Sequence, residues 1–261
     1  MLKWMLSSDQ QIPYHDPRAI DLWFKVLKWF KPDVIDYVGD IDDQACYSRW
    51  TDGRSAEFTA MYKEDGAEHL LPYIAAEAKG ARDFYTQTRS MATNAEIFVA
   101  LGNHDVRVFD YVDKKLVEIK ETVTPNFLWG LDDLGIDYIY YGDKPKHRYG
   151  GLYAHHGIAI SKHAGESVKA DMESFGVSII RGHSHRLATT HKTFTLRDEI
   201  LRGYELGHMS DVNSEGMSYT NIHNWAQGFA VGYVDGDEAH ISLVEIKPDY
   251  TCVVSGKKFA A

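Results

Sequence analysis

One arrangement occurs five times in this chain of 261 residues: a short apolar run with strand character is followed at once by residues of the kinds that bind metal ions. The apolar runs are Leu2–Leu6, Val34–Val38, Ile97–Leu101, Leu152–Ala154 and Val177–Ile180. The polar segments that follow them are Ser8–Gln11, Gly39–Asp43, Gly102–Asp105, His155–Gly157 and Gly182–His185. Open α/β sheets place their ligand sites at the carboxyl ends of the strands. We therefore expect the five segments to meet at one edge of a sheet.

Composition limits the class of protein. With 44% hydrophobic and 25% charged residues, the chain has the composition of a globular protein, and its length allows a sizeable core within one domain. We predict a single domain over residues 1–261, with a helical insertion at about residues 50–92. The two cysteines, Cys46 and Cys252, predict no disulfide framework, which favours the reducing cytoplasm as the compartment.

Charge and hydropathy argue against two kinds of partner. No stretch approaches the roughly 18 apolar residues of a transmembrane helix, so we expect no membrane contact. The net charge of −10 is unlike that of proteins that hold long duplex nucleic acid, although bound metal ions would reverse the field at a site. The sequence carries no signal of the oligomeric state.

The chain begins with a β-α-β unit. Asp16 and Pro17 open a predicted helix, and Pro32 ends it before the strand Val34–Val38. Such a unit makes the first strands parallel. Further helices are predicted at Ala56–Tyr62, Ala67–Phe84, Asp105–Lys120 and His163–Phe175. Further strands are predicted at Tyr138–Tyr141, His147–Tyr149, Ala188–Phe194, Arg202–Met209, Gly228–Val234 and His240–Ile246, the last four antiparallel, and the tail from Lys247 shows no pattern.

The polar segments contain the donors of a two-ion site. Two divalent ions about 3.5–4 Å apart can bind the attacking and leaving oxygens of a phosphate ester, and Asp40, which follows a glycine, is the natural carboxylate to bridge them. The remaining predicted ligands are Asp9 and His185 for one ion, and Asn103, His156 and His183 for the other. Oxygen and nitrogen donors without thiolates suit Mn²⁺, with Fe, Ni²⁺, Zn²⁺ and Mg²⁺ as alternatives. His104 is expected beside the ions, where it would protonate the leaving oxygen or bind a phosphate oxygen.

In this order the motifs resemble those of the calcineurin-like metallophosphoesterase family, whose pattern is Asp-x-His, Gly-Asp-x-x-Asp, Gly-Asn-His-Asp/Glu, His and Gly-His-x-His. The resemblance covers most of the chain and implies an α/β fold: a two-sheet β-sandwich flanked by helices, with a dimetal site at the C-terminal ends of strands. The chain departs from the pattern at Gln11, where the family has histidine. A glutamine amide is a weaker and harder donor than imidazole, so Gln11 would hold its ion less tightly. His15 is an alternative donor, but Pro13 constrains the loop between them.

Further segments resemble the phage and prophage branch of that family. They are the opening Ser8–Asp16 and the later runs Gly207–Asn213 and Asn224–Ala230. If the protein is encoded by a phage, the cytoplasm is that of the bacterial host.

Several residues beside the motifs have two interpretations each. Asp43 would orient another side chain by a hydrogen bond, or would cap the segment that follows it. Asp105 is expected to support the ligands or to contact substrate. Arg107 and Arg181 would bind a phosphate or pair with a nearby carboxylate.

Three histidines outside the predicted ligand set need a separate assessment. His155 precedes His156 on a strand, so its side chain should point away from the site. His208 and His223 would either line the site or serve a structural role.

The resemblance implies a dinuclear metal-dependent phosphoesterase, a hydrolase in which a metal-bridging hydroxide attacks phosphorus. We expect a phosphodiesterase, with a nucleotide or a nucleic acid as the candidate substrate; a phosphomonoesterase is an alternative. A nuclease is a second alternative, and it would need a basic, aromatic-lined groove, for which Lys79, Arg82, Tyr85 and Arg89 are the candidates. A non-catalytic scaffold is the third, although such a protein should have lost several ligands rather than altered one.

Overall fold

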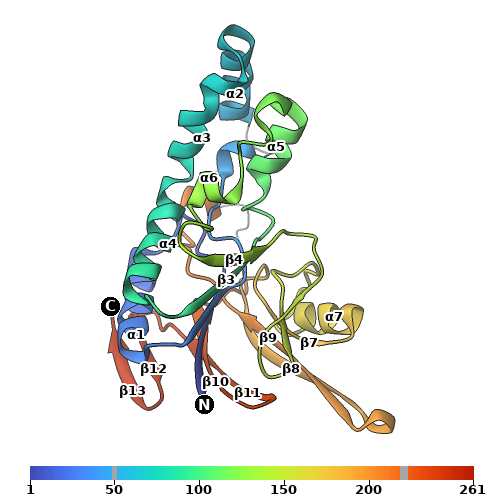
Figure 1. The fold of residues 1–261 in the computed structure, drawn as a ribbon. Helices are drawn as coiled ribbons and strands as arrows, with labels where there is room; N and C mark the ends of the chain where they lie inside the picture. Colours follow the sequence, from blue (N-terminus) through green and yellow to red (C-terminus); the bar gives the residue numbers. More distant parts are fainter. Residues whose placement is uncertain (49–51, 218–222) are drawn as a thin grey trace.

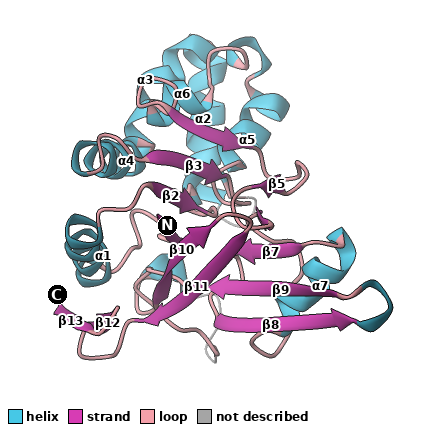
Figure 2. Cartoon of the chain, turned by 60° about the horizontal axis from the view of Figure 1, so that its bottom comes forward, coloured by secondary structure: helices cyan, strands magenta, loops and turns pink. Residues whose placement is uncertain are grey.

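The computed structural model describes residues 1–48, 52–217 and 223–261. Its two larger sheets are mixed and pack face to face, with helices on both outer sides (Figure 1, Figure 2). The predicted fold class, an α/β two-sheet sandwich flanked by helices, is confirmed.

The first sheet has the strand order β11-β10-β1-β2-β3-β4. Its strands are β1 (Leu2–Ser7), β2 (Val34–Tyr37), β3 (Glu96–Ala100), β4 (Ile136–Ile139), β10 (Gly228–Asp235) and β11 (Glu238–Glu245). Strands β1 to β4 are parallel, whereas β10 is antiparallel to β1 and to β11. The parallel pairing of β1 with β2 confirms the β-α-β unit, and β2 is buried along its whole length, as expected for a strand covered on both faces.

The second sheet has the strand order β5-β6-β7-β9-β8. Its strands are β5 (Lys146–His147), β6 (Leu152–Ala154), β7 (Ser178–Arg181), β8 (Leu187–Phe194) and β9 (Glu199–Leu206). Strands β6, β7 and β9 are parallel, and β5 and β8 are antiparallel to their neighbours. The four last predicted strands are antiparallel only within the pairs β8–β9 and β10–β11, because β9 pairs with β7 and β10 pairs with β1.

The inner faces of the two sheets enclose an apolar core. Leu6 and Val38 come from the first sheet, and Ile180 comes from the second. Asp36 shares the inward face of β2 and is fully buried. Arg148 compensates its charge, because Nε and Nη2 each donate to the Asp36 carboxylate at 2.8 Å. This ion pair contributes a specific polar contact inside the sandwich.

Helices cover the outer faces of both sheets. On the first sheet lie α1 (Pro17–Phe30) and α4 (Lys79–Met91), and on the second lies α7 (Glu166–Phe175). The start of α1 follows the prediction, since Asp16 accepts a hydrogen bond from the Arg18 N–H and Pro17 occupies the first turn. In α7, Met172 packs on Ile179 of β7. The layers are therefore helix, sheet, sheet and helix.

The helices between β2 and β3 lie where the insertion is predicted. They are α2 (Asp52–Asp65), α3 (Leu71–Glu77) and α4, and residues 50 and 51 of the predicted range lie outside the described residues. The single helix predicted over Ala67–Phe84 is wrong, because a 3₁₀ turn at Ala67–Leu70 and the boundary between α3 and α4 divide it. Pro72 lies in the first turn of α3, where its missing N–H is tolerated.

Several elements were not predicted. They are α6 (Pro125–Trp129) and the hairpin of β12 (Thr251–Val254) and β13 (Lys257–Ala260), which occupies the tail. The predicted helix after Asp105 is shorter than expected and consists of α5 (Arg107–Lys115) followed by a 3₁₀ turn at Val117–Ile119. Other 3₁₀ turns lie at Ala45–Tyr47, Thr195–Arg197 and Glu215–Met217. In the described part of the chain, no helix has both the length and the apolar character needed to cross a membrane.

Candidate metal centre

The five polar segments lie together at one edge of the sandwich, after β1, β2 and β3 of the first sheet and after β6 and β7 of the second. Backbone hydrogen bonds join neighbouring segments: the Asp9 N–H donates to Gly39 O at 2.9 Å, and the Gly182 N–H donates to His156 O at 3.0 Å. One contact joins the two sheets, because the His183 N–H donates to Asp9 Oδ2 at 2.9 Å. The loops therefore bring side chains from both sheets to one place.

Five of the seven predicted ligands share an uncommon backbone conformation. The φ angle is 55° at Asp9, 56° at Gln11, 54° at Asp40, 68° at His183 and 57° at His185. Residues other than glycine rarely adopt this left-handed region, at a cost of about 1–3 kcal/mol each in strained cases. Such residues persist where the surrounding structure holds them, and they are concentrated at functional sites.

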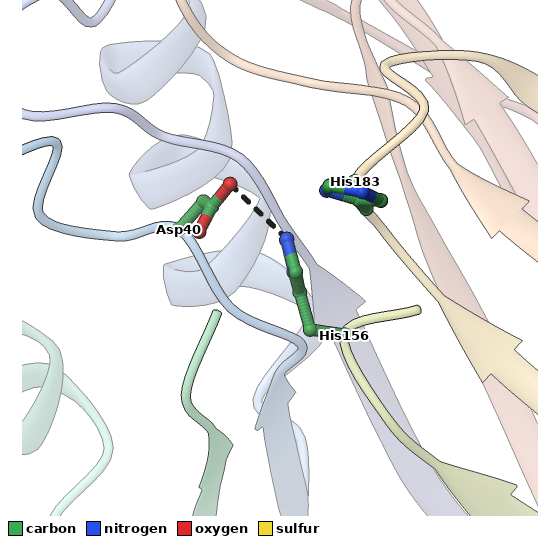
Figure 3. Close-up of side chains that lie close together, drawn as sticks. All are labelled: Asp40, His156 and His183. Carbon is green, nitrogen blue, oxygen red and sulfur yellow. Dashed lines mark ion pairs between the residues drawn. The ribbon is translucent and has the colours of Figure 1, made fainter. Parts of the chain in front are cut away.

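Asp40, His156 and His183 form the most compact cluster of ligand atoms. One ligand atom from each lies within 4.8 Å of the other two. Figure 3 shows the Asp40 carboxylate facing the His156 ring, with His183 beside them on another loop. Asp40 Oδ2 is 3.1 Å from His156 Nε2, and the two imidazole centroids are 5.0 Å apart. Three protein ligands leave coordination positions for water or substrate, as in catalytic metal sites.

The orientation of His156 is set by the backbone. Its Nδ1 lies 2.7 Å from Val38 O, and because a carbonyl only accepts, Nδ1 carries a proton and Nε2 is the ring nitrogen that faces Asp40. Burial lowers the pKa of His156, but the Asp40 carboxylate outweighs burial and raises that pKa to about 9. Burial is likewise outweighed at Asp40, where His156 and His104 hold the carboxyl pKa well below its usual value. The pair therefore favours a positive charge between its facing atoms, which a divalent ion would supply.

Asp9 and His185 form the other half of the site. Asp9 Oδ1 lies 3.1 Å from His185 Nε2, and both residues are buried. Burial raises the pKa of the Asp9 carboxyl, but His185 outweighs it and the pKa is lowered overall. The Gln11 amide points its Nε2 at Asp40 Oδ2, to which it donates at 3.3 Å, while its Oε1 has no hydrogen-bond partner among the described residues. In this half Asp9 and His185 face each other, and the Gln11 amide is the third predicted donor.

The donor set fits divalent ions. Two amide oxygens of predicted ligands, Gln11 Oε1 and Asn103 Oδ1, are buried without a hydrogen-bond partner among residues 1–48, 52–217 and 223–261. An unpaired buried polar atom costs about 1–3 kcal/mol, and a bound ion would satisfy both oxygens. The predicted ligands are all oxygen or nitrogen donors, which suit Mn²⁺ and related ions.

Asp105 supports the Asp40 loop and does not face the centre. Its carboxylate accepts hydrogen bonds from the backbone N–H groups of Asp40, Ile41, Asp42 and Gly102, at 2.8, 3.1, 2.9 and 2.7 Å respectively. These contacts agree with the interpretation in which Asp105 supports the ligands.

Two motif glycines permit the close approach of the loops. A Cβ atom at Gly39 would collide with the His156 ring, and one at Gly102 would collide with the Asp40 carboxylate. The φ angle of Gly39 is also 91°, which favours glycine.

His104 lies beside Asp40 and is held by two neighbours. Its Nδ1 hydrogen-bonds to Asp43 Oδ1, while its Nε2 is 3.1 Å from Arg107 Nη2 and 3.9 Å from Asp40 Oδ2. Burial lowers the pKa of His104, but Asp40 and Asp43 outweigh it and raise that pKa. Asp43 therefore orients His104, and the 3₁₀ turn after it has no side-chain cap. Arg107 pairs with a carboxylate, with Nη1 at 3.5 Å from Asp43 Oδ1.

The remaining histidines divide into structural and site-lining groups. His155 is buried, and its Nδ1 accepts the Gly157 N–H at 2.9 Å. The His208 ring lies 5.3 Å from the His185 ring, so it lines the site. His223 stacks on Trp225 at 4.6 Å, and Trp225 in turn contacts His185.

Two aromatic residues at the site were not predicted. The Trp225 ring packs edge-on against His185 at 4.7 Å, and the Tyr141 ring packs edge-on against His156 at 6.0 Å. Tyr141 lies two residues after β4, which ends at Ile139, and the predicted strand Tyr138–Tyr141 includes it. Its place at the end of a predicted strand was the signal that could have identified Tyr141 as a site residue.

The candidates for a nucleic-acid groove are engaged elsewhere. Arg82 donates to Phe127 O and Leu128 O, and Arg89 donates to Leu134 O at 2.7 Å. Tyr85 is buried, and Lys79 pairs with Asp83 on the same helix. These four side chains therefore do not form an open basic surface.

Comparison with known proteins finds relatives of similar length from bacteriophages. The gene 54 protein of Mycobacterium phage D29 is 26% identical over 259 residues, which cover 97% of this chain and 94% of that protein. The gene 54 protein of Mycobacterium phage L5 is 25% identical over the same length and coverage. No protein-family model matches the chain. The relatives agree with the phage-type motifs of the sequence.

Solved structures show weaker likeness. Vps29 of Chaetomium thermophilum has a TM-score of 0.49 and 12% identity, with 99% of this chain and 97% of that chain covered. YfcE, a phosphoesterase from E. coli, has a TM-score of 0.45 and 12% identity, with 99% of each chain covered. At this level of similarity the solved structures do not bear on the activity of this chain.

Proposed function

We propose that this protein is a dinuclear metal-dependent phosphoesterase that acts on a phosphodiester. The observation that carries the proposal is the convergence of Asp40, His156 and His183 within 4.8 Å of one another, beside His104. The order of the motifs supports phosphate chemistry, because it resembles that of calcineurin-like metallophosphoesterases.

The ligand assignment follows the two halves of the site. Asn103, His156 and His183 would hold one ion, and Asp9, His185 and Gln11 the other, with Asp40 shared between them. Mn²⁺ is the proposed metal. When bound, two such ions activate water as a nucleophile and neutralise charge on the phosphate.

His104 would protonate the leaving oxygen. Asp43 fixes the ring through Nδ1, so that Nε2 is the nitrogen on the Asp40 side. Asp40 and Asp43 raise the pKa of His104, which favours the protonated ring that a general acid needs. Arg107 lies beside the same nitrogen and would bind a phosphate oxygen there.

Asp9, Asp40 and Asp43 are buried at the centre, and two bound divalent ions would outweigh their negative charge. The loaded site would therefore attract the negative charge of a phosphate ester.

The test is hydrolysis by metal-stripped protein to which Mn²⁺, Ni²⁺, Mg²⁺ or Zn²⁺ is returned. We expect Mn²⁺ to restore hydrolysis of bis-p-nitrophenyl phosphate more than that of p-nitrophenyl phosphate, and we expect none with Asp40→Ala. Protein that binds metal but hydrolyses neither ester would contradict the proposal and favour a scaffold.

A further inference from the structure

The loops after β6 and β7 carry His156 and His183, and their backbone needs support. In the loop after β6, Gly157 has a φ angle of 109°. In the loop after β7, His183 and His185 both have left-handed backbone angles. A hydrogen bond from the Gly182 N–H to His156 O joins the two loops, but it fixes neither of them to the rest of the domain.

Arg181 contacts both loops at once. It is the last residue of β7 and is fully buried. Its Nε donates to Gly182 O at 3.0 Å, and its Nη1 donates to Ala159 O at 2.8 Å. Gly157 packs directly on the guanidinium, where a Cβ atom would collide with it. One planar side chain thus fills the space between the two histidine loops.

Asp171 of α7 completes the contact. Its Oδ2 lies 2.7 Å from Arg181 Nη1, and its carboxylate accepts the N–H groups of Ile158 and Ala159, each at 3.0 Å. The loop after His156 is therefore fixed to a helix, and through Arg181 to the loop that carries His183. These contacts also decide between the two interpretations of Arg181, which pairs with a carboxylate and does not reach the surface.

Glu205 of β9 holds the same loop from another side. It is fully buried, and its Oε1 accepts the Ser184 hydroxyl at 2.9 Å. Ser184 lies between His183 and His185, so this bond fixes the left-handed segment at its middle. Glu205 Oε2 accepts a hydrogen bond from the N–H of Gly165, the residue just before α7, at 2.7 Å.

We propose that Arg181, Asp171 and Glu205 are positioning residues that set the separation of His156 and His183, and thereby the metal affinity of that half of the site. None of them is a predicted metal ligand. This inference rests on the metal binding in the proposed function but not on the hydrolysis. Groups that orient metal ligands in this way typically change affinity by about 10- to 100-fold.

The experiment compares Arg181→Lys with Arg148→Lys. Both replace an arginine that pairs with a buried aspartate and has a side chain at most 7% exposed, but Arg148 contacts Asp36 and not the histidine loops. Mn²⁺ is titrated calorimetrically into each metal-free variant, and the thermal midpoint is measured without metal. We expect both variants to melt at lower temperature, while only Arg181→Lys weakens Mn²⁺ binding, by about 10- to 100-fold. The absorption spectrum of bound Co²⁺ should change in the same variant alone.

A milder variant keeps the inference testable if Arg181→Lys does not fold. Ser184→Ala removes only the bond to Glu205 and should also weaken Mn²⁺ binding relative to the wild type. Equal affinity in Ser184→Ala and wild type, or an equal loss in Arg148→Lys and Arg181→Lys, overturns the inference. Wild-type protein that binds Mn²⁺ without hydrolysing either ester defeats the proposed function alone, whereas wild type that binds no Mn²⁺ defeats both.

Discussion

The two halves of the metal centre differ in how completely the protein assembles them. In the half that contains His156, the side chain is fixed by Val38 O, and three ligand atoms lie within 4.8 Å of one another. In the half that contains Asp9, the His185 ring faces the carboxylate, and the Gln11 amide turns its nitrogen to Asp40. An amide donor at Gln11 would weaken this half alone and leave the overall plan of the site intact. We expect one tight and one loose ion.

The largest expected effect comes from the residue that the halves share. Asp40 contacts His156 at 3.1 Å and Gln11 at 3.3 Å, so Asp40→Ala should lose both ions and reduce hydrolysis to background. Metal analysis after dialysis measures the first and a diester assay the second. Two ions retained by this variant would show that Asp40 is not shared.

Substitution of His104 should lower turnover without changing the metal content of either half of the site. It contacts the site through Asp43 and Asp40 and is not proposed as a ligand. His104→Ala should keep the metal content but lower turnover by roughly 10²–10⁴-fold, as for the loss of a general acid. The loss should be smaller for an ester with a good leaving group such as p-nitrophenol. Equal losses with good and poor leaving groups would rule out the acid role.

A matched pair of variants separates the halves directly. His183→Ala should remove the tight ion and His185→Ala the loose one, because each histidine faces a different carboxylate or cluster. Mn²⁺ titration of the two variants should leave one binding event in each, with the stronger event surviving in His185→Ala. The reverse order would invert our ranking of the halves.

The smallest effect is expected at Gln11. An imidazole donates more charge than an amide, so Gln11→His should tighten the loose site and reduce the dependence of activity on added Mn²⁺. The rate at saturating metal need not rise, since a stronger donor makes the ion a weaker Lewis acid. Two equally tight sites in the wild type, unchanged by the substitution, would show that Gln11 is not a ligand.

The sequence predicted where the ligand segments lie better than it predicted the side-chain contacts that hold their loops in place. The ligand segments could be placed because each follows an apolar run, and parallel strands bring their carboxyl ends to one edge. The contacts of Arg181 with Asp171 and of Ser184 with Glu205 could not be predicted, because they join separate elements through single side chains. A pattern of apolar and polar residues carries no information on such pairs.

The assignment of strands to sheets was the main limit on the fold. The hairpins β8–β9 and β10–β11 have similar patterns, and they are separated by the pairing of β9 with β7 and of β10 with β1. The pairing of β10 with β1 spans almost the whole chain, so local periodicity does not report it. The hairpin β12–β13 was missed for a different reason: its strands are short, and Val253 is exposed between buried neighbours at the end of the chain.

The site lies across the boundary between the two sheets, since Asp40 follows a strand of the first and His156 and His183 follow strands of the second. An ion bound there would act as a cross-link between the sheets. It would bind the assembled sandwich but not the separated sheets, so its binding energy would add to the resistance of the domain to unfolding. At a free ion concentration about 100 times the dissociation constant, that contribution is about 2.7 kcal/mol. The melting temperature of the protein would then report the supply of divalent ions in its surroundings.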